Sequence, residues 1–343
     1  MAQTSLIMPA YNAAGYLERS VRSVLNQTER DLRLFVVDDG STDGTAALLD
    51  RLAAEDRRIV PIHAKNAGPA LARNLALERL GEDTEYVMFL DADDVLLPDA
   101  LEYALRGARD GADVTVFGFT IVGEDGSTRD YCEPEQHLNA DTLGASLGRL
   151  YKANLLNQVW GKLFSARLLR DNGIRFEDYR WGEDRLFVFD CLEKSDSVCV
   201  LPECKYRYEM HGGESLITSF YERKFQVCRL IDRRAQALCR RFGVEDDADF
   251  RYMFLKSVFS CLTMLDAPGC PLDAAGKREA VRTIVTDEQV LGRSRGAFGG
   301  LPVQLLAAVL RTGSLPLNRA AFSLVALAGR VSPGLVRLIK HRK

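Results

Sequence analysis

The sequence predicts an α/β protein built on a mostly parallel sheet and followed by a helical region. Up to about residue 90, short apolar runs alternate with segments of helical period, which is typical of a parallel sheet with helices on both faces. From about Phe220 the pattern is helical to the end, interrupted by prolines. We therefore expect two regions, residues 1–218 and 219–343.

Each element is expected from its hydrophobic period and its flanking turn residues. Helix 16–25 places Leu17, Val21 and Val24 on one face, and the run at 86–90 is apolar throughout, as in a strand buried on both sides. The expected strands are 6–8, 32–37, 59–62, 86–90, 114–119 and 198–201. The expected helices are 16–25, 45–52, 69–80, 163–172 and 185–192, with turns at 9–12 and 123–126.

Composition narrows the class of protein. The chain has 343 residues, of which 47% are hydrophobic, so it is globular rather than disordered. A net charge of −3 argues against a general nucleic-acid binder. Eight scattered cysteines without a CxxC pair, and no recognisable signal segment, predict a cytoplasmic protein with reduced thiols.

The last stretch, residues 301–343, contains no Asp or Glu and carries seven basic residues, Arg311, Arg319, Arg330, Arg337, Lys340, Arg342 and Lys343. Its short apolar runs are compatible with amphipathic helices that pack on the protein. The alternative is peripheral attachment to the anionic inner face of the plasma membrane. A contact between two copies in a homodimer is a further expectation for this helical tail.

The strongest sign of chemistry lies in Tyr86-Val-Met-Phe-Leu-Asp-Ala-Asp-Asp94. An apolar strand ends here in Asp91, Asp93 and Asp94, and ligands of open α/β sheets bind at the carboxyl ends of strands. Crowded carboxylates resist joint ionisation unless a cation lies among them. A hard divalent ion shared with a diphosphate would satisfy them. The alternative is a polar loop with helix-capping aspartates.

Other charged residues occupy comparable positions. Asp38 and Asp39 end a second strand, where they can accept hydrogen bonds from a base or ribose or cap the next helix. Arg73 lies on a helix opened by Gly68-Pro69, where it can bind an anion or face solvent. Asp184 precedes an apolar helix, where it can accept a proton from an acceptor hydroxyl or simply cap the helix.

A third segment, Tyr206 to Ser215, contains Arg207, His211 and Ser215 beside Gly212-Gly213. The glycines predict a flexible loop, whose Arg, His and Ser side chains could clamp a diphosphate. The alternative is an ordinary surface loop.

Several enzyme classes lack their motifs. No GxGxxG follows a strand, and no GxxxxGK[ST] loop, GxSxG elbow or histidine-rich metal motif is present. Dinucleotide dehydrogenases, Walker-type NTPases and serine hydrolases of that kind are therefore disfavoured.

The motifs stand in a distinctive order. They are Pro9-Ala-Tyr-Asn12, Val37-Asp-Asp-Gly-Ser-Thr-Asp43, Ala72-Arg-Asn74, Leu90-Asp-Ala-Asp-Asp94, Trp160-Gly-Lys-Leu-Phe164, Asn172-Gly-Ile-Arg-Phe176 and Gly182-Glu-Asp184. Over about residues 4–218 the chain resembles glycosyltransferase family 2, with the GT-A fold. The family often has Asn where Gly161 stands, and its QxxRW motif of processive synthases is not evident.

The resemblance implies roles for these residues. Donor-binding roles are implied for Pro9, Ala10, Tyr11, Asn12, Asp38, Asp39, Arg73, Asp91, Ala92 and Asp93. Asp91-Ala-Asp93 matches the DxD motif, with Asp91 toward the ribose and Asp93 on Mn²⁺ or Mg²⁺, for which His211 is a second candidate ligand. Asp184 matches the base of the family's ED pair. Contacts to the acceptor or diphosphate are implied more weakly for Trp160, Lys162, Glu183, Arg207, His211 and Ser215.

The implied reaction is single-displacement, inverting hexosyl transfer. The donor would be a nucleotide-diphosphate sugar, with UDP favoured. The acceptor would be the hydroxyl of a glycan, a lipid-linked sugar or a polyol in polysaccharide, glycolipid or cell-envelope synthesis. Two alternatives stay open. A nucleotidyltransferase of related fold would want a glycine-rich basic loop where Pro9 to Asn12 stand, and an inactive nucleotide-sugar-binding scaffold would not need both Asp93 and Asp184.

Overall fold

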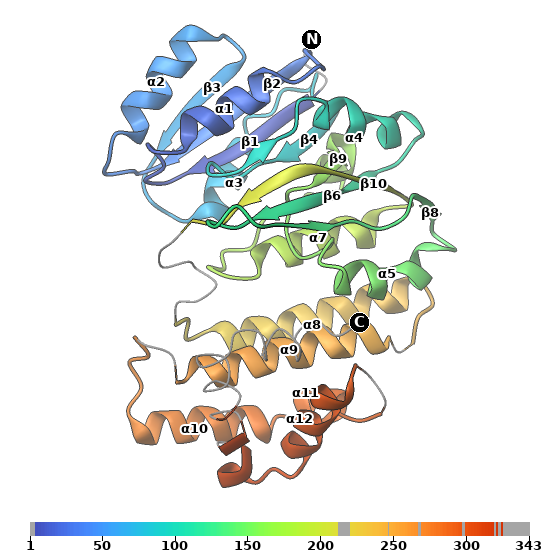
Figure 1. Ribbon diagram of the computed structural model, residues 1–343. Helices are drawn as coiled ribbons and strands as arrows, with labels where there is room; N and C mark the ends of the chain where they lie inside the picture. Colours follow the sequence, from blue (N-terminus) through green and yellow to red (C-terminus); the bar gives the residue numbers. More distant parts are fainter. Residues whose placement is uncertain are drawn as a thin grey trace. The chain divides into compact units, whose positions relative to one another are not determined.

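The computed structural model describes residues 4–211, 220–245, 247–266, 269–296, 299–318, 320–321 and 324. The described chain forms two compact units (Figure 1). The first contains the residues up to 211 and Arg241–Gly243, and the second contains the remaining residues from 220 onward. The predicted boundary near residue 218 lies outside the described residues.

The first unit is the α/β region. Its strands are β1 (Thr4–Ala10), β2 (Leu32–Asp39), β3 (Ile59–Ala64), β4 (Tyr86–Phe89), β5 (Val95–Leu96), β6 (Val114–Val122), β7 (Thr128–Tyr131), β8 (Gln136–Asn139), β9 (Lys162–Ser165) and β10 (Ser197–Glu209). Its helices are α1 (Leu17–Leu25), α2 (Thr45–Glu55), α3 (Pro69–Leu77), α4 (Ala100–Arg109), α5 (Leu143–Lys152), α6 (Ala166–Asp171) and α7 (Glu183–Lys194). Of these, α4, α5, β5, β7 and β8 were not expected from the sequence.

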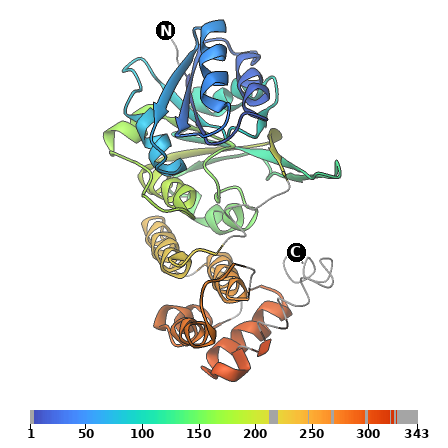
Figure 2. The same ribbon diagram turned by 90° about the vertical axis from the view of Figure 1, so that its left-hand side faces the viewer.

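One sheet contains all of these strands. The order is β3-β2-β1-β4-β9-β6-β10-β5, with β7 beside β6 and β8 beside β10. Strands β1 to β4 are parallel, β10 is parallel to β6, and β9 runs antiparallel to both β4 and β6. Helices cover both faces of the sheet (Figures 1 and 2). The predicted mostly parallel α/β architecture is confirmed.

The first strand is longer than predicted, because Pro9 and Ala10 belong to β1 rather than to a turn. Pro9 has no backbone N–H, which is usually incompatible with a central strand. Here β1 pairs with β4 only as far as Ile7, and the residues that follow pair with β2 alone. Pro9 can therefore extend the strand without breaking a ladder on its other side.

The helix predicted at 163–172 is wrong in its first part. Lys162–Ser165 forms β9, and only Ala166–Asp171 is helical. Leu163 and Phe164 pair with β4 on one side and β6 on the other. Their burial between two strands decides their conformation, and a short apolar run does not reveal this by its period.

The last strand of the unit also departs from the expectation. The predicted strand 198–201 continues as β10 to Glu209, with register shifts on either side of Cys204. The polar stretch around Pro202 hides this continuation in the sequence. Arg207 therefore lies in a strand, not in a loop.

The core beneath the carboxyl edge of the sheet is aromatic. Phe89 makes edge-to-face contacts with the rings of Phe164, Phe176 and Phe187, at centroid distances of 5.9, 5.3 and 5.4 Å. Phe176 also stacks on Phe187 at 4.0 Å. These rings join β4, β9, the segment before α7 and α7 itself. They fix the start of α7 relative to the end of β4.

The second unit is helical in its described residues, as predicted. Its helices are α8 (Lys224–Arg241), α9 (Ala248–Met264), α10 (Ala274–Val285), α11 (Glu288–Arg293) and α12 (Leu301–Arg311). Asp247, Asp273 and Asp287 cap the starts of α9, α10 and α11 through backbone N–H groups. Among described residues, no helix has the length and apolar character needed to cross a membrane. Of the basic residues of the tail, Arg319 and those from Arg330 onward lie outside the described residues.

Candidate functional site

Two acidic strand ends meet at one edge of the sheet. Asp38 and Asp39 close β2, and Asp91 follows β4 directly after Leu90. Because β1 lies between these parallel strands and pairs with both, their carboxyl ends lie at the same edge. The sequence predicted only that each of these carboxylates follows a strand, and the strand pairing puts the ends of these strands at one edge.

The carboxylate of Asp39 is already engaged by the backbone. It accepts hydrogen bonds from the N–H groups of Ala67 and Gly68, each at 2.8 Å. Asp38 accepts from the N–H of Ser41 at 3.1 Å and lies 3.3 Å from His63 Nδ1. Both residues therefore shape the loops around this edge, whatever ligand these loops bind.

Pro9 to Asn12 lie at the same edge. Ala10 is buried, whereas the side chain of Tyr11 is 52% exposed. Asn12 has a φ of 49°, and its Oδ1 accepts a hydrogen bond from Thr42 N at 2.9 Å. Its own N–H donates to Ser41 Oγ at 3.0 Å. These hydrogen bonds hold the end of β1 beside the loop that follows β2, and the side chain of Tyr11 is exposed to solvent.

Arg73 joins the donor-side strand end to the start of α7. It lies on α3, and 3% of its surface is exposed. Its Nη2 donates to Asp91 Oδ1 at 2.8 Å, and its Nη1 donates to Asp184 Oδ1 at 3.0 Å and lies 3.6 Å from Glu183 Oε1. Its guanidinium also lies 5.3 Å from the ring centroid of Phe176. Residues far apart in the sequence therefore share one buried cation.

Three carboxylates around one arginine leave negative charge in excess. Burial raises the pKa of Asp184, although Arg73 opposes this shift. Burial and the neighbouring Asp184 raise the pKa of Glu183 to about 7. Asp184 Oδ2 accepts one further hydrogen bond, from Val159 N at 3.3 Å. A carboxyl group with a pKa of about 7 beside a fixed cation can take up and release a proton near neutral pH.

Asp93 and Asp94 differ sharply in surroundings. Asp94 is fully buried, and its carboxylate accepts from Tyr206 Oη at 2.6 Å and Glu209 N at 2.9 Å, which makes it structural. Asp93 is half-buried, and the described residues offer its carboxylate no side-chain hydrogen-bond donor. Burial and the charge of Asp91 raise the pKa of Asp93. A cation bound at Asp93 would relieve both effects.

Tyr206 is the residue of this site that sequence reasoning missed. Its hydroxyl donates to Asp94 and accepts from Asp91 N at 3.3 Å, so it fixes the backbone on both sides of Asp93. Its ring stacks on that of Trp160 at a centroid distance of 4.3 Å. A tyrosine in an unrecognised strand extension gives no signal of such a contact.

Of the residues assigned to the acceptor or diphosphate, some are buried and others are exposed. Trp160 is nearly buried, and Lys162 is buried with its Nζ bonded to carbonyl oxygens, so the structure places both behind the surface. Arg207 is exposed and pairs with Glu209 at 3.3 Å. The ring of His211 lies 4.2 Å from that of Tyr16, and its charge acts on Asp93. Ser215 lies outside the described residues.

The possible metal ligands in the described part of the chain do not form a cluster. No group of three or more His, Cys, Asp or Glu residues there is arranged to hold a metal ion. A cation at Asp93 would therefore take most of its ligands from elsewhere, such as diphosphate oxygens and water.

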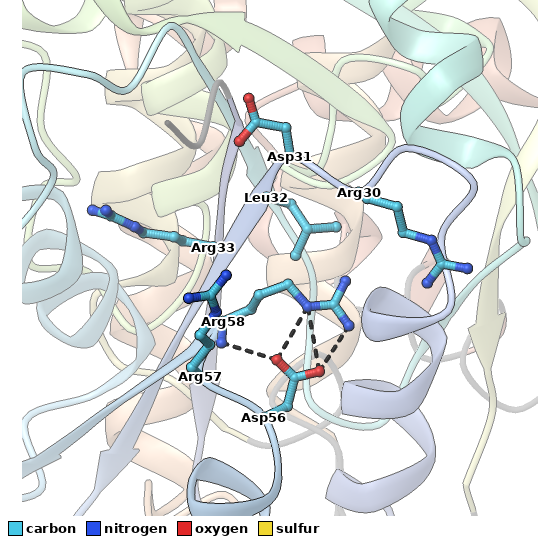
Figure 3. A pocket seen from close by; sticks show the side chains of 7 residues that line it. All are labelled: Arg30, Asp31, Leu32, Arg33, Asp56, Arg57 and Arg58. Carbon is cyan, nitrogen blue, oxygen red and sulfur yellow. Dashed lines mark hydrogen bonds and ion pairs between the residues drawn. The ribbon is translucent and has the colours of Figure 1, made fainter.

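A hollow at the amino edge of the sheet contrasts with this site (Figure 3). Its lining is Arg30, Asp31, Leu32, Arg33, Asp56, Arg57 and Arg58. Arg58 pairs with Asp56 at 2.7 Å, and Arg30 and Arg33 point away from each other in Figure 3. These guanidinium groups do not converge on one point, so the hollow does not form a compact anion site.

Comparisons with known proteins place this site in a family. The family model described as Glycosyl transferase family 2 matches residues 5–172. An uncharacterized glycosyltransferase of Haemophilus influenzae is 32% identical over 196 residues, which cover 57% of this chain and 73% of that protein. The chain belongs to glycosyltransferase family 2.

Two further similarities are to a relative that matches a shorter part of the chain and to a solved structure with low sequence identity. A candidate teichuronic acid biosynthesis glycosyltransferase of Bacillus subtilis, TuaG, is 40% identical over 128 residues, or 37% of this chain and 50% of that protein. The crystal structure of S. aureus TarS 1-349 in complex with UDP-GlcNAc has a TM-score of 0.66, with 18% identity over 96% of this chain and 92% of that chain. This second likeness is one of fold. It agrees with the GT-A architecture of the sheet and with the presence of a helical region.

Proposed function

We propose that the chain is an inverting, divalent-metal-dependent glycosyltransferase that moves a hexosyl group from a nucleotide-diphosphate sugar to a hydroxyl acceptor. The observation that carries this proposal is the double contact of Arg73 with Asp91 and Asp184. The carboxylate assigned to the donor ribose and the carboxylate assigned as base are thereby held by one side chain. Transfer by single displacement needs both groups in one site.

The donor is proposed to be a UDP-sugar. Tyr11, the backbone near Asp38 and Asp39, and Asp91 surround the carboxyl edge, where nucleotides bind in open α/β sheets. The complex of TarS with UDP-GlcNAc, on the same fold, supports this choice. Asp91 is 30% exposed in its side chain, so a ribose hydroxyl can reach it without displacing Arg73.

Mn²⁺ or Mg²⁺ is proposed to bind at Asp93. The donor set fits a hard cation, because no described side chain donates to the Asp93 carboxylate, and burial and the charge of Asp91 raise its pKa. When bound, the cation neutralises charge that develops on the leaving diphosphate. Tyr206 and Asp94 hold the backbone that presents Asp93. His211, whose charge lowers the pKa of Asp93 against the larger effects of burial and Asp91, is a further candidate ligand.

Asp184 is proposed to be the general base. It would accept the proton of the acceptor hydroxyl while that oxygen bonds to the anomeric carbon and the bond from this carbon to the diphosphate oxygen breaks. The raised pKa makes its carboxylate a stronger base, and Arg73 favours its ionised form. Because attack and departure occur on opposite faces of the sugar, the anomeric configuration inverts.

The acceptor is proposed to belong to cell-envelope polysaccharide synthesis, as a glycan, a lipid-linked sugar or a polyol. The name of TuaG supports this class. Attachment of residues 301–343 to the inner face of the membrane, and dimer formation through the helical tail, stay predictions.

A panel of nucleotide sugars tests the function. We expect UDP-sugars to raise the melting temperature more than GDP- or dTDP-sugars, and only with MnCl₂ or MgCl₂, because a ligand of the folded state stabilises it. Prolonged incubation with the best donor should release UDP and free sugar. A nucleotidyltransferase would instead release pyrophosphate from UTP, and an inactive scaffold would bind the donor without turnover.

A further inference from the structure

Lys162 is a buried lysine, and no carboxylate among the described residues forms an ion pair with it. It begins β9 and is 1% exposed. Its Nζ donates to Gln158 O at 2.7 Å and to Trp160 O at 3.3 Å. Burial of an ammonium group is costly, and a methionine would fill similar space without this cost. The ammonium is therefore expected to contribute something that packing alone does not.

The two carbonyls belong to the loop that contacts Asp184. Val159, between Gln158 and Trp160, donates its N–H to Asp184 Oδ2. The loop is also fixed to β6, because Phe117 N donates to Gly161 O at 3.0 Å. Gly161 has a φ of +69°, a backbone conformation that Asn tolerates better than other residues with a side chain. This explains how the family's Asn and this chain's Gly can serve the same turn.

We propose that Lys162 is a positioning residue for Asp184: its ammonium draws the Gln158 and Trp160 carbonyls inward so that Val159 N–H meets Asp184, and its charge keeps Asp184 ionised. This inference rests on the proposed role of Asp184 as base. Lys162 acts from behind the loop and touches no ligand. Its assigned place among acceptor or diphosphate contacts is thereby replaced by an indirect role.

The electrostatic surroundings agree with this role. Burial lowers the pKa of Lys162 to about 7, and Asp184 is the largest influence in the opposite direction, followed by Cys191. The Cys191 thiol is buried, with its pKa raised well above the usual value, so Asp184 is the anion that Lys162 faces. The pKa of Asp184 in turn depends on its burial and on the charges of Arg73, Asp91 and Lys162, and the charge of Asp184 raises the pKa of Glu183.

Carboxyl-carbon NMR of ¹³C-labelled aspartate tests the proposal without a sugar substrate, with the Asp184 signal assigned by its loss in Asp184→Asn. We expect Lys162→Met to move the titration of Asp184 upward by about one pH unit, the effect of removing one nearby opposite charge. Lys205→Met is the matched control. Lys205 is also largely buried, but it pairs with Asp99 at 2.6 Å and Glu203 at 2.8 Å. Its loss should leave Asp184 unchanged.

Two further measurements test the proposal even if Lys162→Met does not fold. Lys162→Gln keeps an N–H donor for the loop and should produce the same upward shift. In the otherwise unchanged chain, the ¹³Cε signal of Lys162 should titrate at lower pH in Asp184→Asn, because coupling between two charges is reciprocal. An unchanged Asp184 titration in either folded Lys162 variant, or an unchanged Lys162 titration in Asp184→Asn, overturns the proposal.

These results are separate from the proposed function. If no nucleotide sugar is turned over but the titrations move as expected, Lys162 positions Asp184 and the transferase assignment fails. If transfer is found and the titrations do not move, the transferase stands and the role of Lys162 is refuted.

Discussion

Charged residues are used differently at the two edges of the sheet. At the carboxyl edge, Arg73 is nearly buried and binds Asp91 and Asp184, residues distant from it in the sequence. At the amino edge, Arg58 binds Asp56 two residues away, and both side chains are about a quarter exposed. Local, solvated pairs are ordinary surface features. A buried network with excess carboxylates is a poor way to gain stability, so its presence in this chain indicates function.

The largest effect, a loss of transfer activity, is expected for substitution of Asp184, the proposed base. Asp184→Asn keeps the shape of the side chain but cannot take a proton, so transfer should fall on the order of 10³-fold. Binding of UDP with Mn²⁺ should persist, since the donor-side residues are untouched. Product formation by mass spectrometry and binding by calorimetry give the two readouts. Turnover at the unchanged rate would refute the assignment.

The next largest effect should be on stability. Arg73→Met leaves three carboxylates without their cation and should lower the free energy of unfolding by about 3–5 kcal/mol at pH 7.5. Arg73→Lys should recover only part of the lost free energy of unfolding, because an ammonium group lacks the planar set of donors that lets Arg73 bind both Asp91 and Asp184. Urea unfolding measures both variants. The deficit should narrow at pH 5, where carboxylates of raised pKa are protonated, and a loss below about 1 kcal/mol would show that the bridge is a surface-like pair.

Glu183 gives a smaller, pH-dependent effect. Its pKa is about 7 in the folded chain against an ordinary value of 4.5, so the folded state holds this proton more tightly than the unfolded state. Its contribution to stability therefore falls as the pH rises from 4.5 to 7. Glu183→Gln, which stays neutral, should gain stability relative to the parent chain across that window. Urea midpoints at pH 5 and pH 8 that differ by the same amount would contradict the raised pKa.

The smallest effect is expected at the amino edge. Arg58→Met removes a partly exposed pair and should cost about 1 kcal/mol or less. Activity should not change. A loss of stability comparable to that of Arg73→Met, or a loss of donor binding, would mean that the hollow of Figure 3 has a role that its diverging arginines do not indicate.

The sequence predicted the location of the site better than its internal contacts. Asp39 and Asp91 were each expected at the carboxyl end of a strand, and β1, which pairs with both strands, brings these ends to one edge. The bridge made by Arg73 could not be predicted, because it depends on how the aromatic core places α7. Lys162 was assigned from the sequence to the acceptor or diphosphate, because its burial depends on Leu163 and Phe164 forming β9, where the sequence predicted a helix. Tyr206 depends on the register of β10 around Cys204, which no local pattern specifies.

The central claim is that a cation links Asp93 to the diphosphate of the donor, and calorimetric titration of UDP tests it most directly. In the parent chain, we expect binding with MnCl₂ and little binding after chelation. In Asp93→Ala the Mn²⁺-dependent part should fall on the order of 100-fold, while the melting temperature stays close to that of the parent. Equal UDP affinity in both proteins, with and without Mn²⁺, would contradict the account.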